Sequence, residues 1–74
     1  MYYTQRLEDL RKDKDLTQEQ VANLLELKRE QYRRYETGAN EIKANFIIKV
    51  CKLYNVSADY VLGLTNEPKP LPKK

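Results

Sequence analysis

A dense group of charged side chains lies near the middle of this sequence. It contains the cations Lys28, Arg29, Arg33 and Arg34 and one anion, Glu30. An arginine side chain carries a planar fork of N–H donors that matches the O6 and N7 acceptors of guanine. The group can instead form a solvated helix face, in which Glu30 pairs with the arginines three and four residues later. Charge alone favours the solvated face. The choice between a solvated face and DNA contact therefore depends on the structure that surrounds the charged group.

Two aromatic residues, Tyr32 and Tyr35, stand inside this charged group. At about 100° per helical residue the two tyrosines point to one side, whereas the anion and the arginines that follow it point roughly the opposite way. The pattern predicts a helix over about residues 28–36 that Gly38 ends. The tyrosines would anchor this helix, and the charges would form its outer face.

Two helices are predicted before the charged one. Apolar residues that include Leu7 and Leu10 repeat at helical spacing, which predicts a first helix over about residues 2–13. Thr17 stands three residues before Gln20, and an apolar set follows directly after that glutamine. This spacing is typical of a capping box, so a second, short helix begins there.

Two more helices are predicted in the second half of the chain. Residues 43–54 are apolar on most sides, which indicates the central and most buried helix. Ser57 can cap a fifth helix, and Gly63 can end it. We expect an all-α fold in one domain at residues 1–64, followed by a flexible, extended Pro- and Lys-rich tail at residues 65–74.

The composition argues against several classes of function. With no histidine and one cysteine, Cys51, the chain lacks Ser-His and Cys-His nucleophile pairs and a zinc cluster, so we expect no enzyme, metal or cofactor. It also lacks a secretory signal and the ~18 apolar residues of a membrane span, so we expect a cytoplasmic protein. Residues 1–63 hold eleven cations against ten anions. Any nucleic-acid argument therefore depends on where the charges sit.

Two short helices joined by about three residues form a helix-turn-helix unit, whose second helix can enter the DNA major groove. The segments LTQEQVANLL at 16–25, RRYETG at 33–38 and NVSADYVLG at 55–63 resemble the Cro and phage-repressor-like, or XRE-like, helix-turn-helix regulators. The resemblance covers roughly residues 3–63. It implies a five-helix fold and a sequence-specific binder of double-stranded DNA that represses transcription in a bacterial, phage or mobile-element context.

The resemblance also implies roles for individual residues. Contacts with base edges are implied for Arg29, Glu30 and Arg34. Glu30 cannot hold phosphate, but it can accept a hydrogen bond from cytosine N4 or orient the arginines that follow it. Contacts with the DNA backbone are implied for Gln18, Lys28, Arg33, Thr37, Asn40 and Lys43.

Two further features of the family concern structure and assembly. Arg11 and Glu36 resemble a partly buried salt bridge between the first and third helices, which is a structural role. The family also implies a homodimer, whose half-sites would lie about 34 Å apart. Candidates for the dimer interface, for which an ordinary core position is the alternative, are Phe46, Leu53, Tyr54, Val56, Tyr60 and Leu64.

Departures from the family pattern leave a second function open. Asp15 and Glu26 occupy places where the family commonly has glycine, so glutamate carries a steric cost unless its turn is shaped differently. Phe46 and Leu53 replace residues that are more often small or polar and could form an additional apolar surface. The alternative is therefore a protein-interaction module, antitoxin-like or adaptor, that uses this surface or the tail on a protein partner.

Overall fold

Five α-helices make up the regular structure of residues 2–70, which are the residues that the computed structural model describes, and no strand occurs among them. The helices are α1 (Tyr2–Asp13), α2 (Gln18–Leu24), α3 (Arg29–Thr37), α4 (Ala44–Tyr54) and α5 (Ala58–Val61). The predicted all-α class and the five predicted helices are confirmed. Part of the predicted tail, residues 71–74, lies outside the described residues.

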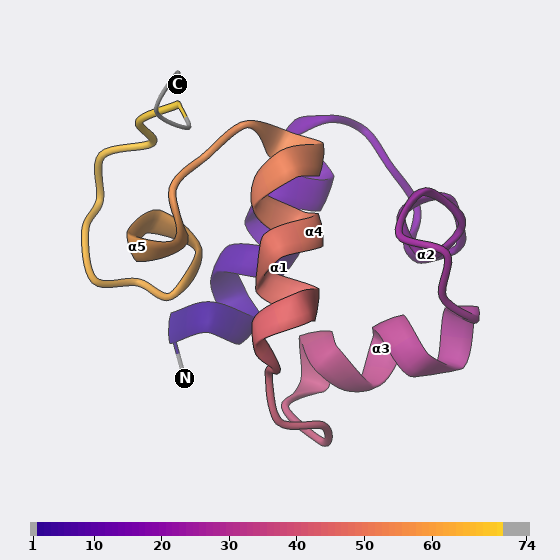
Figure 1. The fold of residues 1–74 in the computed structure, drawn as a ribbon. Coiled ribbons are helices and arrows are strands. Elements are labelled where there is room, and N and C mark those ends of the chain that lie inside the picture. The colour runs from indigo at the N-terminus through magenta and orange to yellow at the C-terminus, as the bar shows by residue number, and fades with distance from the viewer. Residues whose placement is uncertain (1, 71–74) are drawn as a thin grey trace.

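The helices are arranged around α1 and α4, which cross at the centre of Figure 1. On one side of this pair lie α2 and α3, and on the other lie α5 and the described part of the tail (Figure 1). Helix α3 packs against both α1 and α2, while α5 packs against α4 and α1. The charged helix is therefore held from the inside by its neighbours and keeps one face uncovered.

Side-chain caps fix the helix boundaries that the sequence predicts. The backbone N–H of Gln20 donates to Thr17 Oγ1 at 3.1 Å, and the N–H of Thr17 donates to Gln20 Oε1 at 2.8 Å, which completes the capping box at the start of α2. Gly38 ends α3 in the left-handed conformation, with φ of 85°. Ser57 Oγ accepts from the N–H of Tyr60 at the start of α5.

The core is built from one stripe of each helix and not from the whole surface of α4. In α4 the buried side chains are Phe46, Val50, Cys51 and Tyr54, whereas Ile48 is 53% exposed. The prediction that this helix is the central and most buried one is confirmed, because α4 carries more buried side chains than any other helix of the described residues. Its apolar residues are not all covered, however, since the side nearest the viewer in Figure 1 has no helix over it. The complete set of buried apolar residues is Leu7, Leu10, Val21, Ala22, Leu25, Tyr32, Phe46, Val50, Cys51, Tyr54, Val56 and Val61.

Phe46 does not form an additional apolar surface. Its ring stacks on the ring of Tyr35, with centroids 3.8 Å apart and planes inclined by 13°, and its side chain is 3% exposed. Tyr54 and Val56 are also buried, at 8% and 6% exposure. These three dimer candidates are corrected to core positions, because the protomer's own packing already removes their surface from solvent.

The described part of the tail, residues 65–70, lies beside α5 (Figure 1) and is tied to the body of the protein. Arg6 Nη2 donates to Asn66 Oδ1 at 3.1 Å, while the same guanidinium lies 4.1 Å from the centroid of the Tyr60 ring. The N–H of Ser57 donates to the carbonyl of Lys69 at 3.0 Å. These contacts place the described part of the tail against α1 and the start of α5, and the flexibility of the tail stays a prediction.

The turns after α1 and α2 keep the shape that glycine usually supplies. Asp15 and Glu26 have φ of 55° and 60°, which is the left-handed region. After α2, the N–H of Leu27 donates to the Ala22 carbonyl at 2.8 Å and the N–H of Glu26 to the Asn23 carbonyl at 3.1 Å. This pair of bonds is a Schellman motif with glutamate at its left-handed position. Glu26 therefore carries the steric cost of the left-handed conformation, because the turn keeps its usual shape.

Replacing Glu26 with glycine should stabilise the fold. A residue with a Cβ atom in the left-handed conformation costs ~1–2 kcal/mol, which the glycine variant would avoid. Glycine also makes the unfolded chain more flexible, and this offsets part of the stabilisation. We therefore expect a net increase of about 0.5–1 kcal/mol in the free energy of unfolding. Urea denaturation measures the change. Asp15→Gly is the matched control and should gain less, because aspartate tolerates this conformation better. A Glu26→Gly variant less stable than the parent would contradict the assignment of strain.

Candidate nucleic-acid interface

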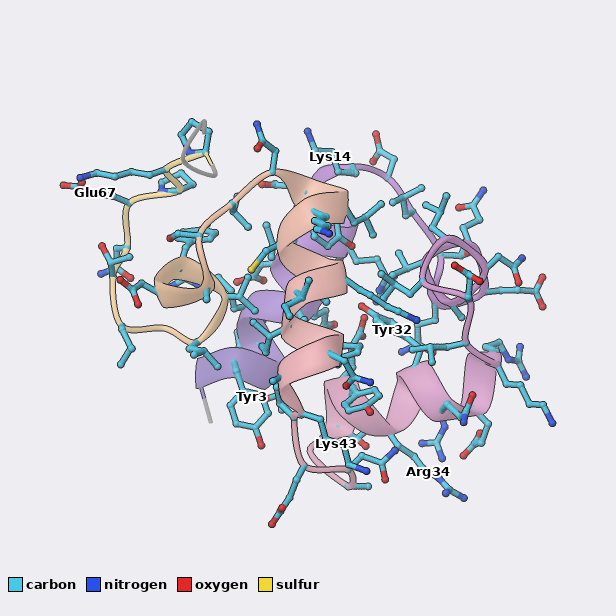
Figure 2. The ribbon with its side chains drawn as sticks, viewed as in Figure 1. Tyr3, Lys14, Tyr32, Arg34, Lys43 and Glu67 are labelled. Atoms are coloured by element: carbon cyan, nitrogen blue, oxygen red, sulfur yellow. The ribbon has the colours of Figure 1, made fainter. Side chains whose placement is uncertain are left out.

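The underside of α3 is anchored by aromatic side chains. Tyr32 is 1% exposed, and half-buried Tyr35 stacks on Phe46 as described above. In Figure 2 Tyr32 points into the interior, while Arg34 extends away from the body of the protein. The aromatic contacts therefore fix which face of α3 remains exposed.

A partly buried ion pair ties α3 to α1 and to the start of α2. Arg11 Nε donates to Glu36 Oε2 at 2.7 Å, and Arg11 Nη1 donates to the Leu16 carbonyl at 2.9 Å in the turn between α1 and α2. The other carboxylate oxygen, Glu36 Oε1, accepts from Gln18 Nε2 at 3.1 Å. The pair that the family resemblance implied is present, and one carboxylate connects three helices.

The contacts of Glu36 lower its pKa. Burial alone would raise its pKa, but hydrogen bonds from Arg11 and Gln18, together with the nearby Tyr32 hydroxyl, hold the pKa below its ordinary value of 4.5. The Tyr32 hydroxyl is buried and close enough to act on the carboxylate, yet it lacks hydrogen-bond geometry. Burial, followed by the proximity of Glu36, raises the pKa of Tyr32 above its ordinary value. The carboxylate thus stays ionised at neutral pH.

Gln18 was expected to contact a DNA phosphate, and the structure places its amide on Glu36. One N–H of that amide is therefore committed inside the protein, while the second remains for another acceptor. Gln18 also lines a surface hollow of about 550 Å³ between the starts of α2 and α3. Arg29 lines the same hollow from α3. The structure thus brings these two predicted site residues together.

Glu30 organises the two arginines that follow it on α3. Arg33 Nε donates to Glu30 Oε1 at 3.1 Å, and Arg33 Nη2 donates to Glu30 Oε2. Arg34 Nε lies 3.6 Å from the same Oε2. The hydrogen bond from Arg33 is the main reason that the pKa of Glu30 is lowered. Of the two roles considered for Glu30, orienting the arginines matches these contacts.

Arg29 differs from its neighbours on α3. It is exposed, and no hydrogen bond or ion pair of its side chain occurs among residues 2–70. The preceding residue, Lys28, is also exposed, and its backbone N–H donates to Gln31 Oε1 at 3.0 Å. These contacts fix the start of α3 and leave the Arg29 guanidinium available for a ligand.

The remaining candidates for backbone contacts lie at and beyond the end of α3. Thr37 Oγ1 donates to the Arg34 carbonyl at 3.2 Å, so its hydroxyl proton is committed in this conformation. The N–H of Asn40 donates to the same carbonyl at 3.2 Å. Lys43 is exposed and immediately precedes α4. These three residues flank the end of α3 opposite to the hollow that Arg29 lines.

Two residues that support the site were missed by the sequence analysis. Gln31 caps the start of α3, and glutamine three residues after an N-cap position was a signal that could have found it. Lys49 Nζ donates to the Leu25 carbonyl at 3.1 Å and so caps the end of α2 from α4. No local pattern predicts that contact, because it depends on how α2 and α4 are placed.

Within residues 2–70, no three or more His, Cys, Asp or Glu side chains lie together in a way that could hold a metal ion. Among the same residues, no helix has the length and apolar character needed to span a membrane.

Comparison with known proteins adds independent information. A family model described as helix-turn-helix matches residues 7–61 of the chain. An uncharacterized HTH-type transcriptional regulator, YobD of Bacillus subtilis, is 40% identical over 68 residues, which are 92% of this chain and 61% of that protein. The cryptic phage CTXphi transcriptional repressor RstR of Vibrio cholerae is 35% identical over 54 residues, or 73% of this chain and 49% of the repressor.

A third relative carries a different kind of name. The antitoxin PezA of Streptococcus pneumoniae is 33% identical over 57 residues, which are 77% of this chain and 36% of the antitoxin. The chain thus spans less than two thirds of the length of each of these relatives. No solved structure matches the chain.

Removing one partner of the Arg11–Glu36 pair should be costly. The two side chains are 13% and 5% exposed, so Glu36→Gln leaves a largely buried guanidinium without its counter-charge. We expect a loss of about 3 kcal/mol in the free energy of unfolding at pH 7. The double variant Arg11→Met/Glu36→Leu should recover much of that loss, because it removes both charges. Urea denaturation of the three proteins measures the difference, and a double variant no more stable than Glu36→Gln would contradict this reading.

The same pair should make stability depend on pH. Since the pKa of Glu36 is lowered in the folded state, its stabilisation is present above the ordinary value of 4.5 and is lost as pH falls through the lower folded pKa. Denaturation from pH 7 to about pH 3 should therefore show a steeper decline for the parent than for the double variant. Parallel pH profiles for the two proteins would show that Glu36 does not cause this pH dependence of stability.

Proposed function

Because the chain belongs to the helix-turn-helix family, we propose that it binds double-stranded DNA through the exposed face of α3 and represses transcription. The family match spans residues from α1 to α5, so it covers every helix on which α3 packs. Two relatives carry the names of a transcriptional regulator and a phage repressor, which supports the regulatory part of the proposal.

The observation that carries the proposal is the fixed orientation of α3. Its aromatic underside packs on the body of the protein, whereas Arg29 forms no side-chain hydrogen bond or ion pair with residues 2–70 and Arg34 extends outward. An α-helix fits the major groove of B-DNA, which is about 12 Å wide, and an arginine fork is suited to guanine. We therefore assign base contacts to Arg29 and Arg34, while Glu30 acts on the arginines.

Contacts with phosphates would hold α3 in the groove at both of its ends. At the start, Gln18 lines the hollow shared with Arg29 and keeps one amide N–H for a phosphate, while Lys28 is exposed immediately before α3. Beyond the end, Lys43 offers an exposed ammonium group. Such contacts position the protein and carry no sequence information directly, so their loss weakens binding to all duplexes.

The proposal includes a homodimer. One α3 reads few base pairs, and two-fold pairing doubles the contacts, placing half-sites about 34 Å apart. The candidates that keep exposed surface are Leu53 and Tyr60, which are half-buried, and Leu64, which is 75% exposed. A regulator of this kind works in the cytoplasm, where bacterial and phage promoters are found.

The similarity to an antitoxin favours one alternative, a helix-turn-helix protein that binds a protein partner. Leu24 and Leu53 line a shallow hollow of about 280 Å³ beside Lys49 and Lys52, whereas buried Phe46 contributes nothing to it. A salt titration with random duplex DNA separates the two functions. DNA binding should weaken steeply as salt rises, while no binding at low salt would favour the protein-interaction module.

Selection of bound sites from a random pool of duplex DNA tests the proposed function. The expected result is an enriched sequence with two related half-sites about one helical turn apart. An unenriched pool after repeated rounds would contradict sequence-specific binding.

Substitutions should divide the interface into two classes. Arg29→Ala and Arg34→Ala should each reduce discrimination at one base pair by ~1–3 kcal/mol, because each removes a guanine-specific fork. Lys43→Ala and Gln18→Ala should weaken binding to all sequences alike. The measurement is the affinity of each variant for the selected site and for duplexes that carry single base-pair changes.

Lys52→Ala is the matched control for lost positive charge, because Lys52 is exposed on α4 and away from α3. It should leave both affinity and discrimination almost unchanged. Equal losses on every duplex for all four interface variants would contradict the division between base and phosphate contacts.

A further inference from the structure

The two arginines that follow Glu30 use it in different ways. Arg33 meets the carboxylate with two nitrogens, Nε on Oε1 and Nη2 on Oε2, so one full edge of its guanidinium is occupied. Arg34 comes closest through Nε, which lies 3.6 Å from Oε2 and forms an ion pair without a hydrogen bond. Among residues 2–70, no hydrogen bond of Arg34 Nη1 or Nη2 occurs. Arg34 therefore keeps the two terminal nitrogens of its guanidinium free of hydrogen bonds.

The three residues lie at different positions around the axis of α3. At about 100° per residue, Glu30 and Arg34 lie nearly opposite Tyr32, while Arg33 lies to the side. With Tyr32 buried, the Glu30 and Arg34 side chains occupy the middle of the exposed face. The free fork of Arg34 thus projects from the centre of the surface that would enter the groove.

We propose that Arg33 and Glu30 are positioning residues, which together hold the Arg34 fork for one base pair and do not themselves bind DNA. This inference rests on the proposed DNA-binding function. It changes the role of Arg33, which the family resemblance assigned to the DNA backbone. It also gives Glu30 a part in specificity without a contact to cytosine.

The strength of these exposed ion pairs depends on whether water or DNA surrounds them. The three side chains are 48%, 55% and 53% exposed for Arg33, Glu30 and Arg34, so in free protein their pairing contributes little to stability. Within a groove, DNA excludes water and lowers the local dielectric constant, which strengthens the pairs. An unpaired Glu30 would there repel the phosphates, so pairing is favoured most in the bound state.

The competing role for Arg33 is a direct phosphate contact. To reach a phosphate with its occupied edge, Arg33 would have to leave Glu30 and abandon both of its bonds to that carboxylate. Glu30 would then face the negatively charged duplex with Arg34 alone as partner, at 3.6 Å. The observed arrangement avoids both costs. The two roles also predict different binding data: a positioning role affects discrimination at one base pair, whereas a phosphate contact affects binding to all duplexes.

The test measures base-pair discrimination and salt dependence for Arg33→Ala, Glu30→Gln and Arg34→Ala, on the selected site and on its single base-pair variants. Arg34→Ala identifies the base pair that Arg34 reads. We expect Arg33→Ala and Glu30→Gln each to reduce discrimination at that pair about 5-fold. Discrimination at the pair read by Arg29 should not change. The salt slope of Arg33→Ala should equal that of the parent.

Two further variants show whether the effect acts through Arg34. Arg33→Lys keeps the charge and loses the fork, so it should lose discrimination to the same extent as Arg33→Ala. In an Arg34→Ala background, Arg33→Ala should cause no further loss of discrimination. Circular dichroism checks that each variant is folded, which is expected because the substituted side chains are half exposed.

Different failures separate this inference from the function on which it rests. A uniform loss for Arg33→Ala on all duplexes, with a salt slope smaller by about one, would assign Arg33 to phosphate and overturn the inference. Additive losses in the double variant would overturn it too. Absence of any DNA binding by the parent would overturn the proposed function as well.

Discussion

The structure depends on the burial of one face of α3. Tyr32 enters the core, Tyr35 stacks on Phe46 of α4, and the Glu36 carboxylate takes two hydrogen bonds from Arg11 of α1. These contacts reach α3 from different elements and oppose both its rotation and its sliding. Without them a helix of nine residues with this many charges would be unstable alone. The arrangement of every charged side chain on its other face follows from this anchoring.

Two glutamates on α3 show how burial separates the roles of one residue type. Glu36 is largely shielded from water, and its ion pair with Arg11 joins three helices through a single carboxylate. Glu30 is more than half exposed, and its pairs with the following arginines contribute little to folding. The first carboxylate therefore fixes the helix, and the second arranges what the helix presents. Both remain ionised at neutral pH, since hydrogen bonds from arginine lower their pKa values.

Local signals predicted the helices well and the packing less well. Thr17 marks a helix start through its side-chain hydroxyl and Gly38 marks a helix end through its left-handed backbone, so the sequence alone places them. Phe46 and Ile48 are both apolar residues of α4, yet one is buried on α3 and the other is exposed, since the crossing of two helices decides which side is covered. The candidate site shows the same limit. Spacing allowed Glu30 to pair with both arginines, but only coordinates distinguish the two hydrogen bonds from Arg33 from the longer ion pair of Arg34.

The central claim is that the outward face of α3, fixed by its aromatic underside, is the surface that meets DNA. Amide chemical-shift mapping by NMR during a titration with the selected duplex tests this claim most directly. The account predicts that the perturbed amides cluster at the start of α2, along α3 and in the residues up to the start of α4. Perturbations confined to α4, α5 and the tail would contradict it, because DNA would then bind a face that the anchoring of α3 does not orient.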